Sequence, residues 1–227
     1  MTRRSLIFAF VLLTAVPCLW AGNVLDGIVA TVNKHIILLS DWEDELRYEA
    51  LVAGRQPAQY LASERKAALD RLIDQELLQE QMHASDFQHA SQAEIDQRIQ
   101  EIRKQFPNAT DDSAWQSVLA RYGFDAQTLK QHVALDLDLL RLVDARLRPR
   151  VSIDSRSIES YYNQTLLPEL RQSGAKEVSL AEVTPKIKEL LTQQKVNELL
   201  EAWLVNLRSG SQIQTEPAAR SFHGELR

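Results

Sequence analysis

The feature that most restricts the fold of this chain is a series of apolar runs with helical spacing, separated by few helix-breaking residues. Only 7 glycines and 7 prolines occur among the 227 residues. That is too few for a β-barrel, a β-sandwich or a glycine-rich phosphate-binding domain. With 44% hydrophobic and 25% charged residues, the chain has enough apolar side chains to build a core. The composition therefore predicts a mostly α-helical protein of one large domain or two small ones.

Charge and cysteine content exclude several classes of function. Acidic residues outnumber basic ones by 31 to 26, whereas a nucleic-acid-binding protein of this size normally carries a basic excess. The single cysteine, Cys18, excludes a disulfide scaffold and a cysteine-based metal site. The best histidine pairing, His132 with Asp136, is better explained as a solvated helix face than as a metal site. No Gly-x-Ser-x-Gly motif is present. We therefore expect no nucleic acid, metal, cofactor or catalytic residue.

The first 21 residues have the layout of a secretory signal peptide. Arg3 and Arg4 form a positive start, residues 5–15 are apolar and uncharged, and Ala21 ends the segment before Gly22. Cleavage after Ala21 leaves 24 basic and 31 acidic residues, a net charge of −7, and no cysteine. This predicts a periplasmic protein with no stable membrane insertion after cleavage. A retained anchoring helix is the alternative, but the segment contains a proline and is short for a hydrocarbon core of about 30 Å.

The chain after the signal segment begins with a hairpin pattern. Apolar residues alternate from Ile28 to Val32, Asn33-Lys34 supplies a two-residue turn, and an apolar run resumes from Ile36 to Leu39. An isolated hairpin is marginally stable in water, so it needs a further strand or a helix against its apolar face. We expect the C-terminal helix to cover it and residues 212–214 to add a short strand, so that the two ends of the chain form one unit.

Cap residues and apolar spacing predict the helices that follow the hairpin. The predicted starts are Ser40 with Glu43 as its capping-box partner, Ser63, Ser91 with Glu94, Asp111 or Asp112, Asp125, Asp154 or Ser155, and finally Thr184-Pro185 as N-cap and first helical residue of a long helix ending near Gly210.

Two of these helices have unusual apolar patterns. The helix from Asp125 to about Leu147 is apolar on two sides, which is typical of a central helix covered by several neighbours. In the last helix, the apolar residues of the first half and those of the second half lie on nearly opposite faces. The two sets are Val183, Ile187, Leu190 and Leu191, and then Val196, Leu199, Leu200, Trp203, Leu204 and Leu207. This pattern predicts halves that pack on different parts of the molecule or on a partner, with a kink as the alternative.

The order of these segments resembles the N-terminal chaperone module of the SurA family, periplasmic chaperones for outer-membrane proteins. Five segments carry the resemblance: residues 25–33 continuing to Ser40-Asp41, residues 68–78, Gly123-Phe124-Asp125 with Arg146 and Val151 further on, residues 157–162, and LEAWLVNLRSGSQI in the final helix. The resemblance implies a multi-helix chaperone core with a small N-terminal β-hairpin, joined by a short C-terminal strand.

The chain departs from the family pattern where the prolyl isomerase domain would lie, so no catalytic residue is assigned from the resemblance. In the family, a parvulin-type prolyl isomerase domain normally follows the segment that ends at Tyr162. Only fifteen residues separate Tyr162 from Val178, with one glycine and no histidine or cysteine, which is too short for a further domain. The predicted organisation is a signal peptide (1–21), a chaperone domain (22–214, comprising 22–170, a polar joint at 171–178, and 179–214) and a flexible tail (215–227).

Aromatic side chains provide the candidate peptide-binding residues. Aromatic rings offer a large contact area with few torsions to restrict, which suits binding of varied segments. Ordinary core positions are the alternative explanation for the same residues. The candidates are Trp42, Tyr48, Phe106, Trp115, Tyr122 and Phe124.

The resemblance implies an ATP-independent holdase that binds unfolded or nascent exported polypeptides, with outer-membrane β-barrel precursors as the expected clients. The lack of a nucleotide-binding loop agrees with a chaperone that does not use ATP. Two alternatives remain open: a peptidyl-prolyl isomerase of the SurA/parvulin family, and a non-catalytic adaptor subunit whose final helix docks onto a dedicated envelope partner.

Overall fold

The computed structural model describes residues 26–57, 60–83 and 87–216, and the predicted signal segment and residues 217–227 lie outside this part. Helices dominate it, as the composition predicts, and a small antiparallel sheet accompanies them. The elements are β1 (Ile28–Val32), β2 (His35–Leu38), α1 (Leu39–Val52), α2 (Ala62–His83), α3 (Gln92–Arg103), α4 (Asp112–Arg121), α5 (Ala126–Leu147), the 3₁₀ turn η1 (Arg148–Arg150), α6 (Ser155–Tyr161), the π-helical turn η2 (Tyr162–Leu166), α7 (Leu167–Ser173), α8 (Leu180–Ser209) and β3 (Ile213–Thr215).

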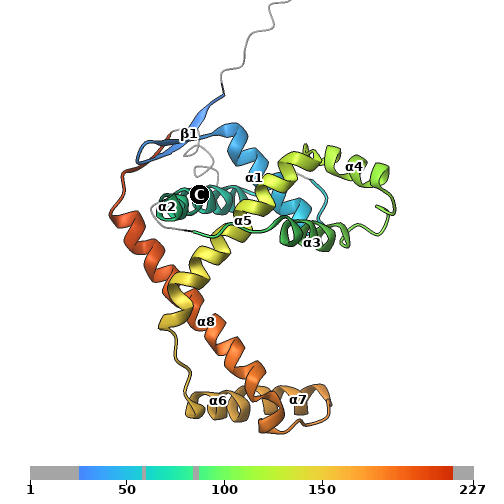
Figure 1. Ribbon diagram of the computed structural model, residues 1–227, viewed down its shortest axis with the longest axis vertical. Coiled ribbons are helices and arrows are strands. Elements are labelled where there is room, and N and C mark those ends of the chain that lie inside the picture. The colour runs from blue at the N-terminus through green and yellow to red at the C-terminus, as the bar shows by residue number, and fades with distance from the viewer. Residues whose placement is uncertain (1–25, 58–59, 84–86, 217–227) are drawn as a thin grey trace, which may run out of the picture.

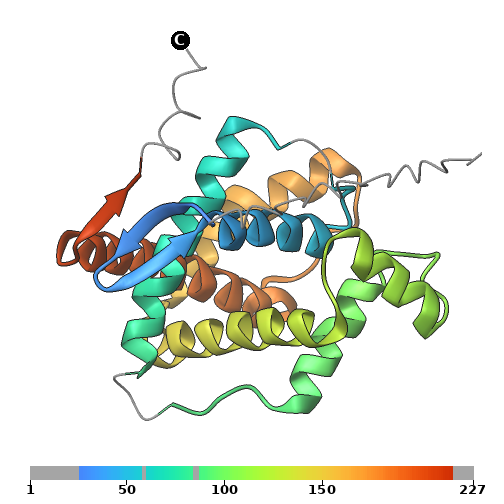
Figure 2. The same cartoon turned by 90° about the horizontal axis from the view of Figure 1, so that it is seen from above.

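The helices form a body and an arm. Figure 1 shows α1 to α5 gathered near the sheet, while α6 and α7 lie at the opposite end of α8. Helix α8 therefore runs from the arm back to the sheet, and its C-terminal part lies beside the strands in Figure 2. Because α8 spans this length, it connects the arm to the core that contains the N-terminal hairpin.

The sheet joins the two ends of the described chain. Its strand order is β2-β1-β3, and all neighbours are antiparallel. Ala30 lies opposite Thr215 and Val32 lies opposite Ile213, so the C-terminal strand pairs with the first strand. This confirms the predicted strand, which begins one residue later than expected. Thr215 consequently belongs to the sheet and not to the tail.

The apolar face of the hairpin is covered by helices. Val29 and Val32 are buried in one cluster with Trp42 of α1 and Leu77 of α2, and Leu207 of α8 packs against its edge. Arg208 fixes the same helix to α2: its Nε atom donates to the Asp74 carboxylate at 2.6 Å. The expectation that the C-terminal helix would cover the hairpin is therefore confirmed.

Asn33, at the hairpin turn, connects three segments. It has a positive φ of 53°, a left-handed conformation that asparagine tolerates better than most residues. Its Oδ1 atom accepts from the Gln212 amide at 2.9 Å, and its Nδ2 atom donates to the Glu80 carboxylate of α2 at 2.8 Å. The backbone amide of Asn33 donates to the Gln212 carbonyl at 2.7 Å. One turn residue therefore links β1, α2 and the approach to β3.

Substitutions at Asn33 separate the contribution of its side-chain hydrogen bonds from that of its positive φ. We expect Asn33→Gly to reduce the free energy of unfolding by about 1 kcal/mol, because it removes the side-chain hydrogen bonds but accepts the positive φ. Asn33→Ala adds backbone strain and should cost about 2–3 kcal/mol. Urea unfolding followed by circular dichroism measures both. Equal losses in the two variants would contradict a strained left-handed turn.

Most predicted helix starts are confirmed by cap hydrogen bonds. The side chains of Asp111, Asp125 and Asp154 each accept a backbone amide at the start of α4, α5 and α6. Ser91 and Glu94 form the predicted capping box of α3. These contacts join residues three positions apart, so they can be predicted from the sequence alone.

Three predicted starts are wrong. Helix α2 begins at Ala62, one residue before Ser63. Helix α1 begins one residue before Ser40, because Asp41 accepts the Leu38 amide at 2.9 Å and the Ser40 hydroxyl binds Asp26 instead. Helix α8 begins at Leu180, so Pro185 lies inside its second turn and not at its first residue. Pro185 has no amide hydrogen to donate to the carbonyl four residues earlier, and the neighbouring Thr184 hydroxyl donates to the Leu180 carbonyl at 2.7 Å.

The apolar pattern of α8 corresponds to two separate packing surfaces. In its first half Ile187 is buried, and Leu191 lines a small cavity together with Ser157 and Tyr161 of α6. Val196 and Trp203, in its second half, pack with α5 residues such as Val143. The change of apolar face along the helix is thus explained by contact with the arm at one end and with the body at the other.

The central helix α5 largely follows its predicted pattern. Leu129 and Val133 are buried against α3 and α4, and Leu142 is buried against α2 and α8. Leu140 is an exception, since 64% of its surface is exposed. It lies on the same side as Val133 but further along the helix, outside the cluster to which α3 and α4 contribute.

Candidate functional site

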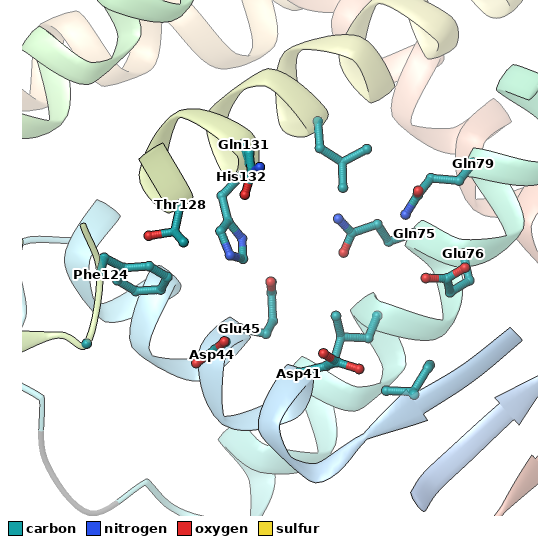
Figure 3. A pocket seen from close by; sticks show the side chains of 14 residues that line it. Asp41, Asp44, Glu45, Gln75, Glu76, Gln79, Phe124, Thr128, Gln131 and His132 are labelled. Carbon is teal, nitrogen blue, oxygen red and sulfur yellow. The ribbon is translucent and has the colours of Figure 1, made fainter. Parts of the chain in front are cut away.

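A groove of about 440 Å³ opens between α1, α2 and α5, and Figure 3 shows it from close by. We call it the inter-helix groove. Its apolar lining consists of Ile37, Leu72, Phe124 and Leu135, and its polar lining of Asp41, Asp44, Glu45, Gln75, Glu76, Gln79, Thr128, Gln131 and His132, with Gly123 at one end. Apolar walls with a polar border are typical of a site that binds another molecule.

Hydrogen bonds between the helices fix their positions around the groove. The Trp42 indole Nε1 atom donates to the Arg65 carbonyl at 2.7 Å, which joins α1 to the start of α2. The Tyr48 hydroxyl donates to the Asp136 carboxylate at 2.6 Å, which joins α1 to α5. The spacing of the groove is therefore set by buried aromatic side chains that are hydrogen-bonded to the neighbouring helices.

His132 forms part of the groove wall. Its imidazole stacks on the Tyr48 ring with centroids 4.8 Å apart, and the Phe124 ring meets it edge-on at 5.3 Å. Burial lowers the pKa of His132, so the imidazole is mostly neutral at pH 7. The sequence-based expectation of a solvated face is therefore wrong for His132, which packs inward because α1 presents an aromatic ring to it.

Glu45 points into the same space from α1. Figure 3 shows Glu45, Gln75 and His132 extending toward one another from three helices. Burial raises the pKa of Glu45 to about 7, and the nearby carboxylates of Glu49 and Asp136 contribute, whereas Arg71 of α2 opposes the rise. Near neutral pH this carboxyl group is therefore partly protonated.

The raised pKa predicts a pH-dependent effect of Glu45→Gln on stability. The folded protein holds this proton more tightly than an unfolded chain with a pKa of 4.5. The resulting stabilisation is fully present below about pH 4.5 and is lost as the pH rises through about 7. Glutamine keeps the neutral form and a donor toward Glu49. We expect Glu45→Gln to match the parent at pH 4 and to exceed it by about 1–3 kcal/mol at pH 8.

Urea unfolding at a series of pH values measures this difference. Glu182→Gln, on the exposed surface of α8, is the matched control and should show no such trend. A pH-independent difference between Glu45→Gln and the parent would contradict a pKa near 7.

The six aromatic candidates from the sequence lie mainly in the core. Trp42, Tyr48, Trp115, Tyr122 and Phe124 are 1–8% exposed, and Phe106 is partly buried. Phe106, Trp115 and Tyr122 pack around one another, with Phe106 centroids 6.0 and 5.8 Å from the other two rings. Phe124 is the candidate that also lines the inter-helix groove. This burial favours the alternative of core positions, and peptide binding by all six residues stays a prediction.

The sequence analysis missed the polar side chains of the groove. Asp41, Asp44 and Glu45 have the spacing of one helix face, and so do Thr128, Gln131 and His132. This spacing was the available signal. It did not show that the polar edges of three helices face one another. Among the described residues, no group of three histidine or acidic side chains is arranged to hold a metal ion.

Comparison with known proteins identifies the family. The family model described as SurA-like N-terminal domain matches residues 4–143. The chain belongs to this family. All residues that line the inter-helix groove fall inside the matched segment, whereas α6, α7, α8 and β3 follow it.

One curated relative in this SurA-like family is Chaperone SurA of Chromohalobacter salexigens. It is 28% identical to this chain over 170 residues, which cover 72% of this chain and 38% of the relative. The aligned region thus spans well under half of that chaperone's length.

The joint between α6 and α8 has no room for an inserted domain. Residues 163–177 form most of the π-helical turn, then α7, and then a turn at Gly174, which has a φ of 68°. The Tyr162 hydroxyl donates to the Val178 carbonyl at 2.6 Å, which closes this short excursion. The expectation that no parvulin domain lies between Tyr162 and Val178 is therefore confirmed.

Within the described part of the chain, no helix combines the length and hydropathy needed to cross a bilayer.

Proposed function

We propose that this chain is an ATP-independent chaperone that holds non-native exported polypeptides in the periplasm, with outer-membrane β-barrel precursors as clients. The observation that carries the proposal is the inter-helix groove, whose lining residues all lie in the segment that matches the SurA-like family. The name of the curated relative, Chaperone SurA, agrees with this function. Export by cleavage after Ala21, with residues 22–214 as the chaperone domain, belongs to the same proposal.

The lining of the groove suits weak binding of varied segments. Leu72, Phe124 and Leu135 offer apolar contact, which stabilises a complex by roughly 25 cal/mol for each Å² buried. Gln75, Gln79 and Gln131 each carry an amide that donates and accepts, so they can pair with a client's backbone in several registers. A volume of about 440 Å³ accommodates a few side chains, which favours rapid release over tight capture.

Filling the groove should weaken this activity. Gln131 lies at the border of the groove and is exposed, so Gln131→Trp adds bulk there without removing a core side chain. We expect the parent protein to suppress light scattering of a diluted, urea-unfolded β-barrel precursor without ATP. Gln131→Trp should need several-fold more protein for the same suppression. Gln194→Trp, on the exposed side of α8, should behave like the parent.

Melting temperatures provide the folding control, and they should change by no more than about 2 °C for surface substitutions of this kind. Unchanged scattering with a several-fold excess of the parent protein would contradict the holdase function. Equal activity of the two tryptophan variants would instead place client binding outside the groove.

The isomerase alternative predicts a different result. Uncatalysed Xaa-Pro isomerisation takes tens of seconds or longer at 25 °C, so acceleration is easily detected. We expect the protein to leave this rate unchanged with a chromogenic Xaa-Pro peptide, while an active parvulin assayed in parallel accelerates it. A rate that rises in proportion to protein concentration would favour the isomerase. The adaptor alternative predicts protection of a single client and no effect on unrelated unfolded proteins.

A further inference from the structure

We propose that the inter-helix groove selects client segments in which a lysine or arginine lies next to an aliphatic or aromatic side chain. This inference rests on the proposed chaperone function and specifies the class of segment that the same groove binds. It depends on three features: the charges that line the groove, the position of the nearest cations, and the apolar surface between the carboxylates.

The charged lining of the groove has one sign. Asp41, Asp44, Glu45 and Glu76 contribute carboxyl groups, and no lysine or arginine is among the lining residues. His132 adds little positive charge near neutral pH, because burial lowers its pKa. Figure 3 shows these carboxylates on the α1 and α2 sides of the groove. A cationic side chain that enters therefore meets attraction from two helices and no opposing arginine or lysine in the lining.

Two arginines outside the lining partly neutralise its negative charge. Arg47 pairs with Asp44, and Arg71 pairs with Glu49. Glu76 lies 3.7 Å from the His35 imidazole; His35 and His83 favour its ionised form, whereas the carboxylates of Asp41 and Glu80 oppose it. Burial raises the pKa of Glu76, which reflects the cost of a negative charge with little compensation.

The Asp41 carboxylate can also accept further hydrogen bonds. One of its oxygens accepts the Leu38 amide at the start of α1, and a carboxylate can accept several hydrogen bonds. Asp41 and Glu76 both line the groove, as Figure 3 shows, and the Asp41 carboxylate is close enough to contribute to the raised pKa of Glu76. A client ammonium or guanidinium group placed there would pair with both.

The apolar lining explains why charge alone is not enough. Leu72 and Leu135 present aliphatic surface from α2 and α5, and the edge of Phe124 closes one end. Lysine and arginine can lay their methylene stems along such a surface while the charged group reaches the border. An adjacent aliphatic or aromatic side chain then fills the remaining apolar space. An acidic segment would be repelled, and a purely apolar one would leave the carboxylates unpaired.

Fluorescence anisotropy with matched peptides tests the preference. The first labelled decapeptide contains two arginines beside a leucine and a phenylalanine. In the second, citrulline replaces both arginines and removes the charge at nearly constant shape. In the third, serine replaces the leucine and the phenylalanine. We expect the parent protein to bind the first peptide at least five-fold more tightly than either of the others. The advantage over the citrulline peptide should shrink in 0.5 M NaCl.

The variant Asp41→Asn/Glu76→Gln identifies the groove as the origin of the preference. Both amides keep an acceptor oxygen, so the α1 cap is preserved while two charges are removed. We expect this variant to bind the arginine and citrulline peptides with affinities within about two-fold of each other, because each exposed or half-exposed charge pair contributes only modestly. The control Glu169→Gln/Glu182→Gln removes the same charge from the exposed arm and α8, and should retain the preference.

Each outcome is decisive. Equal binding of the arginine and citrulline peptides by a parent protein that still suppresses aggregation would overturn the selectivity and leave the chaperone function intact. A preference that survives in Asp41→Asn/Glu76→Gln would also overturn the inference, because the charge would act elsewhere. A second copy of the chain in the groove would appear as a dimer that Gln131→Trp dissociates, which would equally contradict it. Absence of any aggregation suppression would instead refute the proposed function.

Discussion

The structure depends on the contact between the N-terminal hairpin and the C-terminal end of α8. A two-stranded hairpin buries too little surface to be stable alone, and here a third strand and three helices complete it. Leu207 and Ile213 cover the edge of its core, while Arg208 reaches across to Asp74 of α2. Because α1 follows the hairpin directly and α2 packs beneath it, the positions of both helices are set by this long-range contact.

That arrangement also explains how the groove remains open. Helices α1 and α2 share the hairpin core, and α1 and α5 are joined by the hydrogen bond from Tyr48 to Asp136. The three helices are thus fixed at their contact points behind the groove, and the side chains between these points do not close over it. Glu45 and Glu76 remain beside apolar surface with raised pKa values, which is a cost to stability. Unfavourable burial of charge is frequent at sites that bind other molecules.

Aromatic and polar residues have divided roles in this protein. The aromatic side chains around Trp115 build the lobe formed by α3, α4 and the start of α5, and their burial stabilises it. The groove is lined mainly by aliphatic side chains, amides and carboxylates, with Phe124 and His132 as its aromatic members. Such a lining provides little affinity for any single segment, which is compatible with the weak, reversible binding proposed above. The arm of α6 and α7 lies apart from the groove, at the other end of α8.

The sequence by itself determined the elements that depend on neighbours along the chain. The caps at Ser91, Asp111, Asp125 and Asp154, the turn at Asn33-Lys34 and the two apolar faces of α8 could all be predicted, because their contacts span a few residues or follow the helical period. The same local logic failed for α8, which begins at Leu180 and contains Pro185 inside its second turn.

Only the tertiary structure decided which faces became core and which became site. The aromatic residues from Phe106 to Phe124 looked equally suited to either role, and packing between α3, α4 and α5 buried them. The sequence did not distinguish the polar edges of α1, α2 and α5 from other polar helix faces, and these edges meet in the groove because the helices pack together. Periodicity reports which residues lie on one side of a helix. It carries no information on the angle at which helices distant in sequence meet, and that angle creates the groove.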